Sequence, residues 1–262
     1  MRITKKTGNQ IIDNLIYNMV YVEGGTFSMG SAPYDCKNSS EPVHEVTLSS
    51  FYIGKFQVTQ KEWIEIMGNN PSEFVGSNNP VENVSWYDGE QFFIELNRRS
   101  SLNFYFPTEA QWEFAAKGGK EKGKGNRTYL YSGSDDYSEV AWCYYNSGDL
   151  VKKMKSEATW WKKATYEEEI MNNRTHPVGA LRSNELGIYD MSGNVDEWCA
   201  DWYEEYSPES SYNPQGPYHG NEKIFRGGNW RGCYRLCAVV NRQKAKLQYK
   251  TCTNGLRVAL TV

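Results

Sequence analysis

The chain has 262 residues, a formal net charge of −3 and an aromatic content of 15%. This length can bury a substantial core, and the many large rings favour a loop-rich globule in which aromatic side chains supply much of that core. This slightly negative net charge does not favour a nucleic-acid binder, which needs a concentrated basic face. No apolar run reaches the roughly 20 residues that a membrane span requires. The basic N-terminus has no apolar stretch behind it, so we expect a cytoplasmic protein, a phage protein or the mature form of a secreted one.

Strands are predicted at the start of the chain. Residues 1–20 alternate weakly and predict a first strand or hairpin. Residues 19–30 predict two strands around a Gly-Gly turn. After a loop over 31–42, residues 43–58 are again typical of strands.

Three helices follow, and capping residues mark where they begin. Thr59-Gln-Lys-Glu62 and Thr108-Glu-Ala-Gln111 have the spacing of capping boxes, which satisfy free backbone N–H groups at a helix start. Between them, apolar residues at helical spacing predict a helix from about Ser85 to Arg99. We therefore expect about three helices in the first half of the chain.

The second half is expected to be irregular. Residues 120–127 are rich in Gly and Lys and predict an exposed loop. Residues 149–174 are charged but carry a helical stripe of apolar residues, and this pattern predicts a helical insertion. After Pro177 we expect short strands and ordered loops without a good helix. No linker or internal repeat divides the chain, so one domain over residues 1–262 is expected.

The cysteines and histidines give no familiar metal motif. The cysteines are Cys36, Cys143, Cys199, Cys233, Cys237 and Cys252. They contain no Cys-x-x-Cys pair, which argues against a zinc site of the usual spacing. They are also too sparse for a disulfide-dense scaffold. The histidines are scattered, and we interpret them as structural or exposed.

A set of motifs stands in one order over residues 19–260. They are Val22-Glu-Gly-Gly-Thr-Phe-Ser-Met-Gly30, Phe56-Gln-Val-Thr-Gln-Lys-Glu-Trp63, Pro80-Val-Glu-Asn-Val-Ser-Trp86, the segment 106–116, Gly187-Ile-Tyr-Asp-Met-Ser-Gly-Asn-Val-Asp-Glu-Trp198, Phe225-Arg-Gly-Gly-Asn-Trp230 and Asn254-Gly-Leu-Arg-Val258. In this order they resemble the formylglycine-generating-enzyme family, whose members carry the sulfatase-modifying factor domain. The resemblance implies an α+β, C-type-lectin-like fold that is loop-rich and has short strands.

The resemblance also implies a chemistry from which this sequence departs. Active family members oxidise a substrate cysteine with O₂, using two cysteines with four residues between them that bind Cu(I), a soft ion suited to sulfur. Here Cys233 and Cys237 have three residues between them, and a one-residue shift can turn a side chain to the opposite face of a strand. We therefore favour a non-catalytic member and keep a copper-dependent oxidase acting through Cys233 and Cys237 as the alternative.

A structural calcium site is the second implication of the resemblance. It would involve Asp190, Gly193, Val195 and Glu197, where a side-chain oxygen, two carbonyls and a carboxylate converge in family members. Calcium prefers six to eight hard oxygen ligands and accepts backbone carbonyls, so these residue types suit it. A tight turn in which Glu197 pairs with a neighbour is the alternative.

The segment over residues 230–250 is the candidate binding surface. Arg and Tyr are the residue types that anchor protein interfaces. The predicted ligand-binding residues are Trp230, Arg231, Tyr234, Arg235, Arg242, Lys244 and Tyr249. The corresponding stretch varies in relatives diversified by retroelements, so we expect a variable protein that binds a protein or glycan ligand. The alternative for this segment is an ordinary solvated loop. The alternative for the chain as a whole is an accessory domain that docks to a larger assembly through residues 149–174.

Overall fold

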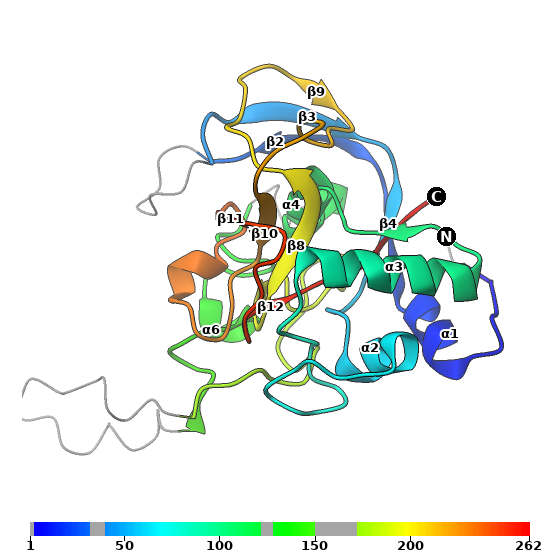
Figure 1. Cartoon of the computed structure of the whole chain (residues 1–262). Helices are drawn as coiled ribbons and strands as arrows, with labels where there is room; N and C mark the ends of the chain where they lie inside the picture. Colours follow the sequence, from blue (N-terminus) through cyan, green and yellow to red (C-terminus); the bar gives the residue numbers. More distant parts are fainter. Residues whose placement is uncertain (1–2, 32–39, 122–127, 150–171) are drawn as a thin grey trace, which may run out of the picture.

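The computed structural model describes residues 3–31, 40–121, 128–149 and 172–262, and Figure 1 shows how their helices and strands are arranged. The α-helices are α1 (Gln10–Tyr17), α2 (Gln60–Met67), α3 (Trp86–Ser100), α4 (Glu109–Ala116) and α6 (Tyr137–Val140). The described residues also include the short 3-10 helices η1 (Gly119–Glu121) and η3 (Tyr234–Cys237). The mixture of helices and short strands agrees with the expected α+β class.

The first four-stranded sheet brings the two ends of the chain together. Its order is β1 (Met19–Val22), β4 (Phe51–Gly54), β13 (Ala259–Thr261) and β5 (Phe104–Tyr105). All neighbouring strands are antiparallel, and Ile53 of β4 pairs with Val20 on one side and Ala259 on the other. Every residue of β4 is buried, as the central position of this strand requires.

The second four-stranded sheet carries most of the segment that was expected to be functional. Its order is β11 (Arg242–Ala245), β10 (Lys223–Arg226), β8 (Asp196–Trp202) and β12 (Asn254–Gly255). The pair β8–β12 is parallel and the others are antiparallel. Two smaller sheets contain β2 (Gly25–Met29), β3 (His44–Leu48) and β9 (Ser211–Tyr212), and β6 (Ala141–Trp142) with β7 (Ser192–Gly193). Figure 1 places the β2–β3–β9 sheet at the top and η3, in orange, at the left.

The three predicted helix starts are confirmed. The Glu62 carboxylate accepts hydrogen bonds from the N–H and hydroxyl of Thr59 at 2.7 and 2.6 Å. At the other two starts, Ser85 exchanges hydrogen bonds with Asp88 and Thr108 does so with Gln111. These interactions are local in sequence, and this is why the sequence identified them.

Residues 1–20 differ from the prediction, because they contain helix α1 as well as strand β1. The Asn9 side chain accepts hydrogen bonds from the N–H groups of Ile11 and Ile12 and caps the helix. Ile12, Leu15 and Ile16 are then buried along one face. An apolar spacing of three and four residues, rather than alternation, was the signal that the sequence interpretation missed.

Most of the predicted insertion over 149–174 lies outside the described residues. Its two ends lie side by side, because Arg174 forms an ion pair with Asp149 at 3.1 Å and its backbone N–H bonds to the Ser147 carbonyl. Residues 172–262 contain no α-helix, as expected for the part after Pro177.

Candidate functional site

Four oxygen atoms of the 190–197 loop converge on one buried amide. The Gln57 side-chain nitrogen, which has two hydrogens to donate, lies within hydrogen-bonding distance of the carbonyl oxygens of Asp190, Gly193 and Val195 at 3.2, 3.3 and 3.0 Å, and of the Glu197 carboxylate at 3.0 Å. These four are the residues that the resemblance assigned to calcium. Asp190 and Gly193 reach this arrangement with positive φ angles of 57° and 81°.

The details around this amide define which atoms could hold a cation. Asp190 contributes its carbonyl rather than its carboxylate, because the carboxylate accepts from the Gly179 N–H at 2.7 Å. Burial raises the pKa of that carboxyl to about 6. The Gln57 side-chain oxygen is buried without a hydrogen-bond partner among the described residues. An amide's oxygen and nitrogen are distinguished only by their partners. Turned over, the amide of Gln57 would offer a fifth oxygen, so the residues fit a hard cation.

Glu197 is held from the opposite side by a buried cation. Arg257 donates to both of its carboxylate oxygens at 2.8 and 2.7 Å, and the Trp112 indole adds a bond of 2.7 Å. Arg257 is itself fully buried. The 190–197 loop is thus tied to helix α4 and to the C-terminal strand region.

The double glycine after β10 makes the bend on which the next segment turns. Gly227 and Gly228 have φ angles of 97° and 70°, which glycine adopts without steric cost. A Cβ atom on Gly228 would lie 2.7 Å from the Leu236 carbonyl oxygen, so η3 packs directly on the bend. Trp230 follows and is buried at 7% exposure, with its indole donating to the Cys252 carbonyl at 2.9 Å. Its ring contacts Phe74 edge-on at 5.1 Å.

The cysteines of this region are free thiols in different surroundings. Cys237 and Cys143 are fully buried, whereas Cys233 is half-buried. Burial raises the pKa of Cys143 to about 11 and that of Cys237 well above its usual range. In the metal-free protein burial therefore disfavours the thiolate of Cys237, which is the form that binds soft metals.

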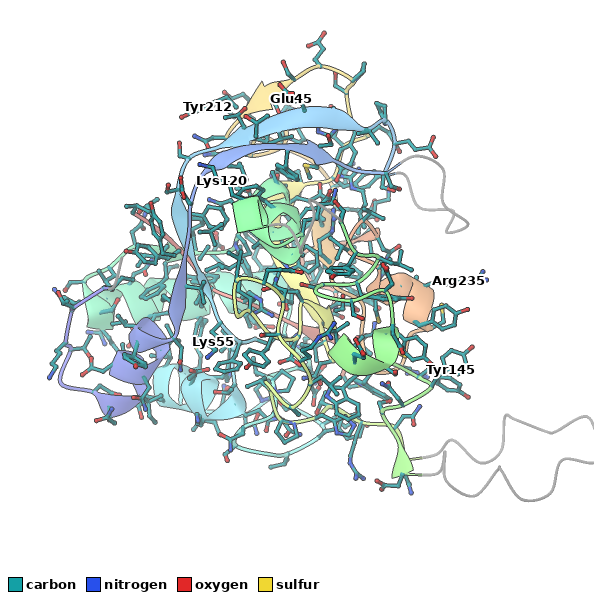
Figure 2. All side chains as sticks on the ribbon, turned by 180° about the vertical axis from the view of Figure 1, so that it is seen from behind. Glu45, Lys55, Lys120, Tyr145, Tyr212 and Arg235 are labelled. Atoms are coloured by element: carbon teal, nitrogen blue, oxygen red, sulfur yellow. The ribbon has the colours of Figure 1, made fainter. Side chains whose placement is uncertain are left out.

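Exposed and half-buried tyrosines gather around η3. Tyr234 stacks on Tyr137 with ring centroids 5.1 Å apart and contacts Tyr145 at 5.7 Å. Tyr145 is 47% exposed and touches Tyr144 edge-on at 5.5 Å. The guanidinium of Arg235 lies 5.9 Å from the Tyr234 ring. We call these five residues the tyrosine patch. Arg235 and Tyr145 project outward from the same side of the molecule in Figure 2.

The remaining predicted binding residues are spread over different surroundings. Arg231 is exposed next to the buried Trp230. Arg242 is buried at 4% exposure, and its guanidinium donates to both carboxylate oxygens of Glu109. Lys244 forms an ion pair with Glu222 at 3.2 Å. Tyr249 is 44% exposed over the Phe225 ring. Of the seven, Tyr234 and Arg235 are the two that belong to the tyrosine patch.

Sequence reasoning missed the tyrosines that come from a distant segment. Tyr137, Tyr144 and Tyr145 precede Tyr234 by about ninety positions, and no spacing rule connects them. The backbone N–H of Tyr144 bonds to the Gly232 carbonyl at 2.9 Å, which joins the two segments. The adjacent pair Tyr144-Tyr145 was the available signal.

The described residues place limits on other kinds of site. Within them, no three His, Cys, Asp or Glu side chains gather as a metal-binding group. No helix in the described ranges has both the length and the hydropathy to cross a bilayer.

Comparison with known proteins gives consistent matches. Residues 9–262 match the sulfatase-modifying factor enzyme 1-like domain. The chaperone protein LppX of Paenibacillus barcinonensis is 36% identical, and the alignment covers 95% of this chain and 88% of LppX. The formylglycine-generating enzyme of Thermomonospora curvata is 24% identical, and the alignment covers 89% of this chain and 88% of that enzyme.

Solved structures agree with the expected fold. Treponema denticola variable protein 1 is similar with a TM-score of 0.77 and 27% identity, over 93% of this chain and 95% of that one. PvdO from Pseudomonas aeruginosa has a TM-score of 0.72 and 22% identity, over 93% of this chain and 94% of PvdO. At this identity the likeness supports the fold alone. The expected fold of the formylglycine-generating-enzyme type is confirmed.

Proposed function

Because the chain belongs to the sulfatase-modifying factor enzyme 1-like family, we propose that it is a non-catalytic member that binds a polypeptide through the tyrosine patch. The single observation that carries this proposal is the clustering of Tyr137, Tyr145 and Tyr234 beside Arg235 on the surface of η3. Tyr and Arg dominate the binding energy of protein interfaces, because they offer large rigid contact areas together with hydrogen-bonding groups.

Two of the comparisons favour a binding role. LppX is described as a chaperone protein, and a chaperone acts by binding another polypeptide. Variable protein 1 of Treponema denticola, which is similar over nearly the whole chain, is described as a variable protein. A protein ligand is therefore favoured over a glycan at this surface.

The geometry of the patch suits a binding surface that is formed before the ligand arrives. Tyr234 is fixed between Tyr137 and Tyr145, and the backbone bond from Tyr144 to Gly232 holds the two segments together. Side chains that are already ordered lose less conformational entropy on binding. Arg231 and Arg235 add positive charge at the rim, so we expect a segment with acidic residues to bind best.

The proposal is tested with a permanently unfolded polypeptide as the probe. Fluorescence anisotropy of labelled, reduced and carboxymethylated α-lactalbumin should rise when the protein is added. Tyr145→Ala and Tyr234→Ala should each weaken binding by about thirtyfold, as for interface residues of the hot-spot type, which contribute about 2 kcal/mol or more. The melting temperature of Tyr145→Ala should stay unchanged, since that side chain is half exposed.

Tyr218→Ala is the matched control, because Tyr218 is fully exposed and makes no ring contact in the described structure. It should bind the probe like the unaltered protein. The proposal is wrong if the double variant Tyr145→Ala and Arg235→Ala retains full affinity.

Two measurements distinguish the proposed binding protein from the alternative, a copper-dependent oxidase. Native alkylation followed by mass spectrometry should label Cys233 and leave Cys237 and Cys143 unlabelled until the protein is unfolded, because the latter two are enclosed. With Cu(I) and O₂, we expect no aldehyde on a Cys-x-Pro-x-Arg peptide. Formation of that aldehyde, lost in Cys237→Ala, would establish the oxidase instead.

A structural calcium ion on the 190–197 loop is the second part of the proposal. The three carbonyls and the Glu197 carboxylate around Gln57 provide hard oxygens, the Gln57 oxygen would be a fifth, and water would supply the remaining ligands. Such an ion would stabilise the loop that leads into β8 and carry no chemical step.

A further inference from the structure

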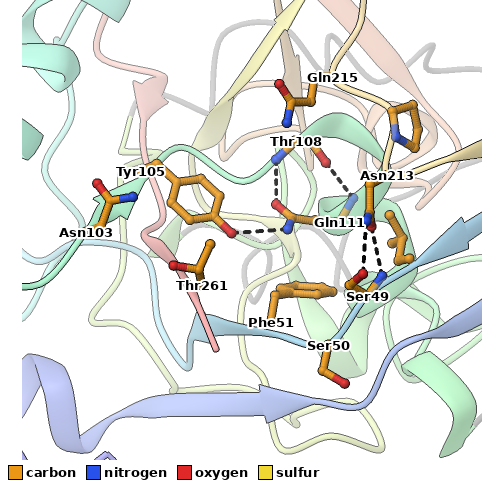
Figure 3. A pocket seen from close by; sticks show the side chains of 12 residues that line it. Ser49, Ser50, Phe51, Asn103, Tyr105, Thr108, Gln111, Asn213, Gln215 and Thr261 are labelled. Atoms are coloured by element: carbon orange, nitrogen blue, oxygen red, sulfur yellow. Dashed lines mark hydrogen bonds between the residues drawn. The ribbon is translucent and has the colours of Figure 1, made fainter.

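A polar pocket opens at the edge of the first sheet, away from the tyrosine patch. Its volume is about 350 Å³, which lies in the range of small-molecule sites. Five segments meet there: the β3–β4 connection, β5 with the residue before it, the start of α4, the loop after β9 and the end of β13. Figure 1 places β4 and the C-terminus on the right and η3 on the left, and Figure 3 shows the pocket from close by.

The lining of the pocket carries no charged side chain. All twelve lining residues are uncharged, although 23% of the whole chain is Asp, Glu, Lys or Arg. An enclosed charge needs a partner of opposite sign. A charged ligand would find none here, whereas a neutral ligand with many hydrogen-bonding groups would meet amides and hydroxyls on several sides.

Two amides of the pocket are held in fixed orientations. The Gln111 side chain accepts from the Thr108 N–H at 3.0 Å and donates to the Tyr105 hydroxyl at 3.2 Å. The Asn213 side chain accepts from the Ser49 N–H at 2.8 Å and donates to the Ser49 hydroxyl at 2.9 Å. An amide nitrogen has two hydrogens, so each retains one for a ligand. Figure 3 shows both amides aligned by these bonds.

Other groups at the rim have no hydrogen bond to the described parts of the chain. They are the side chains of Asn103, Gln215 and Thr261, and all three can both donate and accept. Tyr105 places a half-buried ring in the wall, while Phe51 supplies an apolar floor. Burial raises the pKa of the Tyr105 phenol, so its hydroxyl stays protonated and can donate.

We infer that this pocket binds a neutral saccharide. Vicinal hydroxyls both donate and accept, as the amides of Gln111, Asn213 and Gln215 do, and the C–H face of a pyranose ring can lie against Tyr105. The fixed amides would set the orientation of the sugar, and the free rim amides would close around it. This site is separate from the tyrosine patch and does not depend on the function proposed for that surface.

Saturation-transfer NMR on the full chain provides the test. The probes are glucose, galactose, N-acetylglucosamine, maltose and cellobiose at about 10 mM, above the dissociation constants of weak millimolar complexes. We expect saturation transfer to at least one of them. Asn103→Ala and Gln215→Ala should each weaken binding about fivefold, which corresponds to one lost hydrogen bond. Both side chains are exposed, so folding should be unaffected.

The controls locate the binding. Gln248→Ala, at another exposed glutamine in the 230–250 segment, and Tyr234→Ala should both retain saccharide binding. Glucosamine and glucuronic acid, which carry a charge, should bind more weakly than their neutral counterparts. The inference is overturned if none of the neutral probes binds, if the double variant Asn103→Ala and Gln215→Ala binds like the unaltered protein, or if the charged sugars bind equally well.

Discussion

The amide nitrogen of Gln57 lies 3.0 Å from a carboxylate oxygen of Glu197, at the point where three carbonyl oxygens of the same loop also converge. This one side chain thus occupies the position in which a cation would be held. For an ion to bind there, the Gln57 amide would have to turn over and withdraw, so that its oxygen becomes a ligand. The four loop oxygens, now 3.0–3.3 Å from the amide nitrogen, would have to close to the roughly 2.3–2.6 Å of calcium ligands.

Calcium is therefore expected to stabilise the protein. Ca²⁺ should raise the melting temperature by several degrees and excess EDTA should reverse this, since a ligand at 100 times its Kd contributes about 2.7 kcal/mol. Gln57→Leu should abolish the response. Gln60→Leu, at a second fully buried glutamine, should lower stability and keep the response. Identical melting curves in Ca²⁺ and in EDTA would refute the site.

Gly228 should tolerate no side chain. An added Cβ would lie 2.7 Å from the Leu236 carbonyl oxygen, and φ is +70°, so Gly228→Ala should cost about 3 kcal/mol. Gly68 has a similar φ of +75° but open space around it, so Gly68→Ala should cost only about 1 kcal/mol. Urea denaturation measures both, and equal costs would mean that η3 does not pack on the bend.

Removal of the Arg226 guanidinium should be among the most damaging changes in the core. Arg226 donates to Glu109 at 2.5 Å and to Glu113 at 2.6 Å, and all three side chains are buried. Arg226→Met removes one cation from each of these enclosed carboxylates, while Arg242 stays paired with Glu109 and Lys117 with Glu113, so we expect a loss of about 3 kcal/mol in urea denaturation. Arg98→Met breaks an exposed pair with Glu95 and should change stability little. A small effect of Arg226→Met would show that the network rearranges.

Asp201 should make the protein less stable as the pH rises. Burial, with a further contribution from Glu109, raises the pKa of its carboxyl from 3.8 to about 7. Between these two pH values the folded state holds a proton that the unfolded chain has released. The contribution of Asp201 to the free energy of unfolding therefore falls from pH 4 to pH 7 and is constant above pH 7.

The variant Asp201→Asn removes this titration and keeps the side-chain oxygen that can accept from the Glu109 N–H. Its stability relative to the unaltered protein should therefore rise by a few kcal/mol between pH 4 and pH 7. Asp149→Asn, at an exposed carboxylate, should follow the pH profile of the unaltered protein. Parallel profiles for Asp201→Asn and the unaltered protein would show that the carboxyl is already ionised.

Several elements could be predicted from the sequence because their causes are local. Thr59, Ser85 and Thr108 each bond within three residues of themselves, so the helix starts can be identified from spacing alone. The converging oxygens of the 190–197 loop were expected from the family resemblance, not from local spacing, and they meet at Gln57, which lies more than 130 positions earlier in the chain. Helix α1 was also local, and its apolar spacing was misinterpreted as alternation.

The parts decided by the tertiary structure join segments that are far apart in the chain. Arg242 was expected at the binding surface, yet it lies inside because Glu109, which precedes it by 133 positions, offers both carboxylate oxygens. Tyr145 and Tyr234 meet only because the loop after β6 bonds to Gly232. The sequence determined which residues could bind and where helices begin. Long-range packing decided which of those residues face solvent, since burial depends on neighbours that no spacing in the sequence identifies.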